Sequence, residues 1–588
     1  MNWKWGWIAV LSFVAVLALV VIFKPGMFPE KPNIILISID TLRQDHVGTY
    51  GYHKDITPVL DSIASEGVKF RNSYAAAPWT LPSHMSMFTG LPPSVHKVDF
   101  DVKHLAQSLK TFPVMLKDNG YHTGGIISGV YLKSVYGFSR GFDVYKEMFN
   151  SGAEKLTDSG IDWIKGHSDR PFFLFLHYFD VHYPYRPPEK YAKRLGVDTA
   201  ENKWLRYGRL SYMRKFSDPA IKMSPRIRHR VEQLYDSEIL RVDTNIGRLI
   251  EFLKDNKLYD STVITVTSDH GEEFCEHGSF GHYHQLYAEV INVPLIIRLP
   301  GKLPPGKIHV EPVSSVDIPV TLLSMAGITA PEQFRRHGID LSGMAGKDSK
   351  NSNLNSRKLI SETRKGSSPH FALIHDGYKF ITPYRFQPLL KTKKWVETGT
   401  GLFQAGIEGN DLANLAAAQL SDERTPVLIR RYRKDIHQYV KNNIDCVRIV
   451  FIPPKKGTTV FEGSMTYKNI PELTPFGITL TDSDFIRDGA DGSSTEFRVV
   501  LQEDIKELLI HLSESIAESE DFHIKIIHSG KVIFNSGIDI SKLSKAEMIF
   551  KGLPGSIYII RQGRPDGHSK PSLSDKEKSI LKSLGYIN

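Results

Sequence analysis

The chain has 588 residues, of which 41% are hydrophobic and 24% are charged, with a net charge of +9. This length exceeds what one hydrophobic core supports, so we expect two or more domains, and the composition excludes a disordered, collagen-like, coiled-coil or multi-span membrane chain. The 2 cysteines exclude a disulfide scaffold and a cysteine-rich zinc module, so any metal must be held by Asp, Glu and the 23 His. No long Lys/Arg run is present, which argues against a nucleic-acid partner.

Residues 1–30 are predicted to form a transmembrane signal-anchor and a proline-rich hinge. Residues 5–23 are 19 uncharged residues in a row, which as a helix would span roughly 28 Å, close to the hydrocarbon thickness of a bilayer. A cleavable signal peptide is the alternative, but its apolar region is normally shorter and precedes a small-residue cleavage site. Lys4 favours an inside N-terminus, although two lysines after the apolar run weakly oppose it. We therefore expect a single-pass membrane protein with its catalytic part in the periplasm or extracellular space.

Residues 31–418 are predicted to form the catalytic domain, an α/β fold. Short runs of apolar, often β-branched residues are typical of strands buried on both faces of a sheet. Strands that alternate with helices predict a mostly parallel sheet with helices on both faces, in which ligands bind at the carboxyl ends of the strands. The expected strands are residues 33–39, 123–128, 172–177, 262–267 and 294–298, and the expected helices are residues 58–66, 105–119 and 231–256.

The rest of the chain is predicted to be richer in antiparallel strands. Alternating patterns at residues 370–375 and 378–381 suit a small antiparallel subdomain at the end of the catalytic domain. Three further regions are expected: a basic helical connector at 419–445, a β-rich accessory domain at 446–570, and a short C-terminal helix at 571–588. Strands of the accessory domain are expected at residues 447–452, 497–501, 522–527 and 557–561.

Acidic residues and histidines follow three of the expected strands directly. One such residue commonly caps a helix or forms a turn, but three clusters after separate strands should converge at one edge of the sheet. Two carboxylates and an imidazole would form a mixed nitrogen and oxygen metal site. The residues are Asp40 after the first strand, His177, Asp180 and His182 at the end of the 172–177 strand, and Asp269 and His270 after the 262–267 strand.

Thr80 is the candidate nucleophile. Pro82 suits the first turn of a helix, so Thr80 should lie at a helix N-terminus, where negative charge is favoured. A threonine hydroxyl is a poor nucleophile unless its pKa is lowered, which a divalent metal can do. On this segment alone, the simpler interpretation that Thr80 is a helix cap is favoured.

Together these segments resemble the sulfatase family of the alkaline phosphatase superfamily. The resemblance implies a sulfatase-like hydrolase or phosphotransferase that acts on ester bonds. It covers residues 32–418 and is carried by the motifs at residues 32–43, 78–90, 176–185, 267–273, 276–278, 281–287, 293–297 and 410–415.

The nucleophile segment departs from the sulfatase pattern. Sulfatases have Cys or Ser in Cys/Ser-x-Pro-x-Arg, which is oxidised to formylglycine, whereas this chain has Thr80 and His84 in those places. The set Asp40, Thr80, Asp269 and His270 resembles that of phosphoethanolamine transferases and lipoteichoic acid synthases. This resemblance implies one divalent metal held by these four residues, and a phospho-threonine formed at Thr80. An imidazole ligand favours zinc or manganese over calcium.

Further candidates surround this set. His182 and His284 are assigned to catalysis, and His282, Arg43 and His177 to substrate binding. For His182, His282 and His284, a structural role is as well supported as a role in catalysis or substrate binding. These three residues are also the candidates for ligands of a second metal. For Arg43 a surface salt bridge is at least as well supported as an anion site.

Three functions remain open at this point. The first is a membrane-anchored hydrolase or transferase that cleaves phosphate esters through Thr80. The second is a sulfuric ester hydrolase without formylglycine, and the third is a non-enzymatic binding protein on a degenerate scaffold. The expected substrate is a phosphate or sulfate ester, and an envelope lipid or glycan is compatible with an anchored enzyme.

Overall fold

The computed structural model describes residues 31–345 apart from 100–102, 150, 198–215, 217–221, 284 and 300, then residues 357–363 and 370–383, residues 431, 432, 435, 436 and 439, and a set of strands up to residue 561. The predicted anchor, most of the connector, the C-terminal helix and His284 lie outside these residues. Within the described part, no helix has the length and apolar character needed to cross a bilayer.

The centre of the fold is an eight-stranded sheet with the order β11-β2-β10-β7-β1-β6-β4-β5. Strand β1 pairs in parallel with both β6 and β7, and β10 is antiparallel to both of its neighbours. The mostly parallel α/β sheet expected from the sequence is therefore confirmed. The strands are β1 (Asn33–Ile39), β2 (Val68–Phe70), β4 (His122–Ile127), β5 (Val144–Glu147), β6 (Phe172–Tyr178), β7 (Thr262–Thr267), β10 (Leu295–Arg298) and β11 (Lys307–His309).

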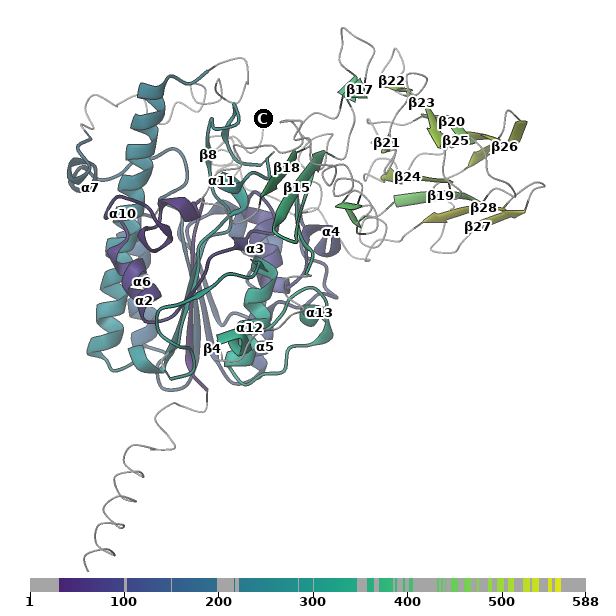
Figure 1. Cartoon of the computed structure of the whole chain (residues 1–588). Helices are drawn as coiled ribbons and strands as arrows, with labels where there is room; N and C mark the ends of the chain where they lie inside the picture. The colour runs from purple at the N-terminus through teal and green to yellow at the C-terminus, as the bar shows by residue number, and fades with distance from the viewer. Residues whose placement is uncertain are drawn as a thin grey trace, which may run out of the picture.

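Helices cover both faces of this sheet (Figure 1). Alternate residues of β1 divide between the two layers: Ile34 and Leu36 pack in the cluster that contains Phe88, whereas Ile35 and Ile37 pack in the cluster that contains Leu234. This alternation explains the continuous apolar run of β1, because both of its faces are buried. One layer contains α3 (Thr80–Thr89), α5 (Phe112–Asp118) and α12 (Ile318–Met325), and the other contains α2 (Pro58–Ser65), α6 (Ala153–Lys165) and α10 (Pro225–Asp255).

The helix expected at 105–119 is shorter than predicted. It begins only at Phe112, with Thr111 as its N-cap and Pro113 in its first turn. The apolar residues Leu105 and Ala106 are buried outside this helix, and the backbone N–H of Leu105 bonds to the carbonyl of Tyr136. Burial in an irregular segment thus produced the apolar pattern that resembled a helical turn.

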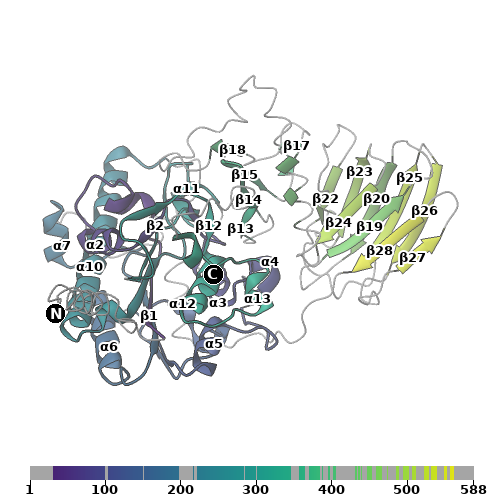
Figure 2. The same ribbon diagram turned by 60° about the horizontal axis from the view of Figure 1, so that its bottom comes forward.

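Three further sheets have four or five strands each and are entirely antiparallel. The first, β13-β14-β15-β18, is the small C-terminal sheet expected from the sequence. The other two lie side by side (Figure 2), and the assignment of 446–570 to a separate domain stays a prediction. Their strands are β13 (Leu359–Thr363), β14 (His370–His375), β15 (Tyr378–Pro383), β18 (Gly401–Gln404), β19 (Cys446–Ile452), β20 (Thr459–Thr466), β21 (Leu473–Thr474), β22 (Phe485–Asp488), β23 (Ser494–Leu501), β24 (Lys506–His511), β25 (Phe522–His528), β26 (Lys531–Ile538), β27 (Met548–Lys551) and β28 (Ser556–Arg561).

Candidate active site

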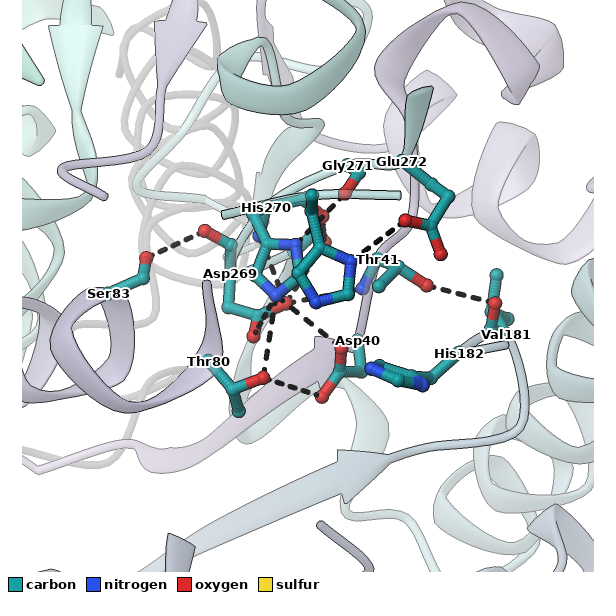
Figure 3. Close-up of polar contacts among 12 residues, drawn as sticks. Asp40, Thr41, Thr80, Ser83, Val181, His182, Asp269, His270, Gly271 and Glu272 are labelled. Atoms are coloured by element: carbon teal, nitrogen blue, oxygen red, sulfur yellow. Dashed lines mark hydrogen bonds and ion pairs between the residues drawn. The ribbon is translucent and has the colours of Figure 1, made fainter. Parts of the chain in front are cut away.

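The carboxyl ends of β6, β1 and β7 bring together side chains that are far apart in the sequence. Ser38 of β1 lies opposite His177 of β6 and Thr267 of β7, so Asp40 and Asp269 emerge just beyond the same edge of the sheet. Thr80 is the first residue of α3, in agreement with the position expected from Pro82. Figure 3 shows the side chains of Asp40, Thr80, Asp269 and His270 turned towards one another.

The spacing of these four side chains suits a cation. The Oγ1 atom of Thr80 lies 3.4 Å from Oδ2 of Asp40 and 3.4 Å from Nε2 of His270. The same Nε2 atom lies 3.3 Å from Oδ2 of Asp269 and 3.7 Å from Oδ1 of Asp40. Ligand atoms placed 2.0–2.1 Å from a tetrahedral metal are about 3.4 Å apart. Asp40 Oδ1 and Asp269 Oδ2 are buried without a hydrogen-bond partner in the described part, so both oxygens suit a cation.

Backbone contacts orient this set. Nδ1 of His270 lies 2.9 Å from the carbonyl oxygen of Gly271, so we place the proton there and leave the Nε2 lone pair facing Thr80. Oδ1 of Asp269 accepts from the backbone N–H of His270 at 3.0 Å and of Thr41 at 3.3 Å. Thr41 has a φ of +58°, an uncommon value for a β-branched residue. The turn after β1 therefore adopts a strained backbone that directs an N–H at Asp269.

Two buried histidines contact the carboxylates from the side of the sheet. Nε2 of His177 lies 3.2 Å from Oδ2 of Asp40, and Nδ1 of His84 lies 3.3 Å from Oδ2 of Asp269. Burial lowers the pKa of His84 to about 3 and that of His177 to about 4, so both rings are neutral at physiological pH. His84 was not among the predicted site residues, although its place one helical turn after Thr80 puts both on one face of α3.

His182 and His282 lie beside His270. The ring centroid of His282 is 4.3 Å from that of His270 and 5.1 Å from that of His182. Nδ1 of His282 lies 2.8 Å from Oε1 of Glu272, a residue that the sequence analysis did not select. Burial lowers the pKa of His182 to about 4. The three rings of His270, His282 and His182 are thus close neighbours, whereas His284 lies outside the described residues.

Arg43 forms ion pairs, as one of its two interpretations expected, and its assignment to substrate binding stays a prediction. Its side chain is 5% exposed, so these pairs are more buried than the expected surface salt bridge. Its guanidinium donates to Asp45 and Glu276, each at 2.7 Å, and to the carbonyl oxygen of Glu272 at 3.1 Å. The group also lies over the ring of Phe274. These contacts give Arg43 a structural role in the loops that follow β1 and β7.

Comparison with known proteins identifies the family. A family model described as Sulfatase matches residues 32–328. The chain belongs to the sulfatase family. A second model, described as N-sulphoglucosamine sulphohydrolase, C-terminal, matches residues 275–390.

Similar proteins are distant in sequence but share the fold. A protein named Sulfatase from Formosa agariphila is 26% identical over 411 residues, which cover 60% of this chain and 79% of that protein. Human iduronate 2-sulfatase is 26% identical over 384 residues, which cover 51% of this chain and 70% of that protein. A putative sulfatase structure from Bacteroides fragilis aligns with a TM-score of 0.56 and 23% identity, over 71% of this chain and 96% of that one. A phosphonate monoester hydrolase from Agrobacterium radiobacter aligns with a TM-score of 0.54 and 18% identity, over 70% and 96%.

These matches support an ester-hydrolysing enzyme. Members of this family typically bind a divalent metal, and the Asp40, Asp269 and His270 cluster is a site where this chain could hold one. The non-enzymatic binding protein considered from the sequence is therefore set aside.

Proposed function

We propose that this enzyme cleaves phosphate esters with Thr80 as its nucleophile. The observation that carries the proposal is the placement of the Thr80 hydroxyl, 3.4 Å from both Asp40 and His270 at the first residue of α3. An unmodified threonine there cannot supply the formylglycine on which the sulfatase pattern depends. The enzyme could either hydrolyse the ester or transfer its phosphoryl group to an acceptor hydroxyl, because both reactions begin with attack of Thr80 on phosphorus.

Asp40, Asp269, His270 and Thr80 would hold one divalent cation. When bound, this cation would lower the pKa of the Thr80 hydroxyl and offset charge on the ester oxygens. The imidazole ligand favours zinc or manganese over calcium.

The reaction then has two steps at Thr80. Thr80 Oγ1 forms a bond to phosphorus while the bond from phosphorus to the leaving oxygen breaks, and the hydroxyl proton ends on the released alcohol. A water molecule, or an acceptor hydroxyl, next attacks the phospho-threonine, restores Thr80 and carries the phosphoryl group away. His182 and His282 are the side chains proposed to contact the ester oxygens, and the same role is proposed for His284.

A sulfate ester is the second candidate substrate. It is favoured by the names of the relatives, which include iduronate 2-sulfatase, and by a solved structure described as a complex with D-glucosamine-2-N,6-O-disulfate. The threonine nucleophile argues against it. With the apolar residues 5–23 as an anchor, we propose an envelope lipid or glycan as the carrier of the ester.

Parallel assays of aryl phosphate and aryl sulfate test this proposal. The full chain is supplied with zinc, manganese or calcium, and we expect the phosphate ester to be cleaved faster. Thr80→Ala should abolish turnover while metal is retained, whereas Thr89→Ala, a buried position of the same helix, should retain it. A clear preference for sulfate, or full activity of Thr80→Ala, would contradict the proposal.

A further inference from the structure

A second group of metal-ligating side chains adjoins the proposed site. His84, His177 and Asp269 each offer one ligand atom, and these atoms all lie within 4.8 Å of one another. All three residues are fully buried. They come from three elements, since His84 is on α3, His177 is in β6 and Asp269 follows β7.

Hydrogen bonds do not explain the burial of His177, although its Nε2 lies 3.2 Å from Oδ2 of Asp40. In the described part of the chain, both of its ring nitrogens are buried and form no hydrogen bond. The Oδ2 atom of Asp269 is likewise buried and forms no hydrogen bond there. The ring sits against Gly129, where a Cβ atom would lie 2.8 Å from Cε1 of His177. A buried polar group left unpaired costs about 1–3 kcal/mol. A bound cation would use the lone pairs of both His177 and Asp269.

We propose that His84, His177 and Asp269 form a second cation site, adjacent to the one that includes Thr80. Two imidazoles and one carboxylate are a donor set that favours zinc. Nδ1 of His84 lies 3.3 Å from Oδ2 of Asp269, close to the separation of about 3.4 Å between two ligands of a tetrahedral zinc.

The contacts of His84 allow it to serve as a ligand. Its Nδ1 lies 3.0 Å from the carbonyl oxygen of Thr80, and its Nε2 lies 2.9 Å from Oγ of Ser38. With the proton on Nδ1 the ring donates to Thr80, and with the proton on Nε2 it donates to Ser38. The second form gives up the hydrogen bond to Thr80 and leaves an Nδ1 lone pair 3.3 Å from Oδ2 of Asp269, where a cation could bind both atoms.

Asp269 belongs to both clusters, so it would bridge the two cations. In two-metal phosphoryl-transfer sites the ions lie about 3.5–4 Å apart. Two divalent cations together with the carboxylates of Asp40 and Asp269 would have a net charge of +2. A phosphate dianion bound at Thr80 would neutralise this charge. The second site should therefore fill more readily when phosphate is present.

This site differs from the second metal site for which His182, His282 and His284 were candidates. In the part of the chain that the structure describes, His182 and His282 do not join a third ligand in a cluster of this kind. The inference shares Asp269 with the proposed first site but does not depend on Thr80 as the nucleophile.

Counting zinc in the full chain tests the proposal. Protein stripped with a chelator is titrated with zinc in the presence of inorganic phosphate, separated from free metal and analysed by mass spectrometry for zinc. We expect two zinc ions per wild-type chain, one in His177→Asn and one in His84→Gln. The control His309→Asn alters a buried histidine in β11 that pairs with Glu311, and it should retain two.

Anomalous diffraction at the zinc edge tests the proposal on the wild-type protein alone, so it remains valid if a variant does not fold. Two peaks, one of them between His84 and His177, would support the proposal. One zinc per wild-type chain, with one peak beside Thr80, would overturn it and leave the two histidines as hydrogen-bond donors to the carboxylates. Thr80→Ala should keep both ions and lose turnover, so failure of the nucleophile assignment and failure of the second site give different results.

Discussion

Nδ1 of His282 lies 2.8 Å from Oε1 of Glu272, with both side chains buried. This contact fixes the plane of the imidazole next to His270. Glu272→Gln replaces the carboxyl group that contacts Nδ1 with an amide and preserves the shape of the side chain. We expect kcat to fall by about 10–100-fold, with a smaller change in KM, because such partners orient active-site histidines.

Tyr185→Phe is the matched control for this prediction. The Tyr185 hydroxyl is another side-chain partner of Glu272, at 3.3 Å, and its loss leaves the contact with His282 in place. Steady-state kinetics of both variants should show the larger loss in Glu272→Gln. Equal losses would mean that Glu272 acts on the packing of the loop rather than on His282.

Arg43→Met should lower stability. Glu276 is buried and pairs with Arg43 at 2.7 Å. Removal of the guanidinium therefore leaves the negative charge of this buried carboxylate with fewer neighbouring positive charges. Breaking a buried ion pair costs about 3–5 kcal/mol, whereas an exposed pair contributes about 1 kcal/mol or less. Arg228→Met is the control, because Arg228 contacts the same Glu276 at 3.0 Å with a side chain that is 38% exposed. In urea unfolding, Arg43→Met should have a much lower free energy of unfolding than Arg228→Met. Similar values for the two variants would contradict the structural role of Arg43.

His337 should make the protein less stable in acid. Burial, with Arg336 and Arg357 nearby, lowers the pKa of His337 to about 4, whereas an unfolded chain has a histidine pKa of about 6.5. The unfolded state therefore takes up a proton first, and the stability from the neutral ring is present above pH 6.5 and lost as pH falls towards 4.

His337→Gln should flatten this dependence by about 1–2 kcal/mol, a figure reduced for the partial exposure of the ring. The measurement is the free energy of unfolding by urea between pH 4 and pH 7, relative to the parent chain. His229→Gln alters an exposed histidine of α10 and should leave the slope unchanged. The same slope in His337→Gln and the parent would show that other groups control the acid response.

The positions of Asp40, Asp269 and His270 could be predicted from the sequence because each follows a strand buried on both faces. Parallel neighbours end at one edge, so the polar residues after β1 and β7 had to meet there. Thr80 was predictable from the helix start marked by Pro82, and β1 and β7 were predicted to the residue.

Other parts of the site depend on contacts that a pattern does not contain. His84 stood in the place of an arginine, and only the direction of α3 shows that its ring reaches Asp269. The assignment of His177 to substrate binding stays a prediction. The sequence pattern did not show that its ring contacts Asp40 and packs against Gly129 of the loop after β4. Arg43 looked exposed because its partner Glu276 is 233 residues away.

The central claim is that the Thr80 hydroxyl carries the transferred group. The most direct measurement is the accurate mass of the peptide containing Thr80 after the metal-loaded enzyme is mixed with an aryl phosphate and quenched in acid. We predict a phosphoryl adduct on Thr80 in the wild-type chain and none in Thr80→Ala. Turnover with no adduct on Thr80, or an adduct on another residue, would contradict the account.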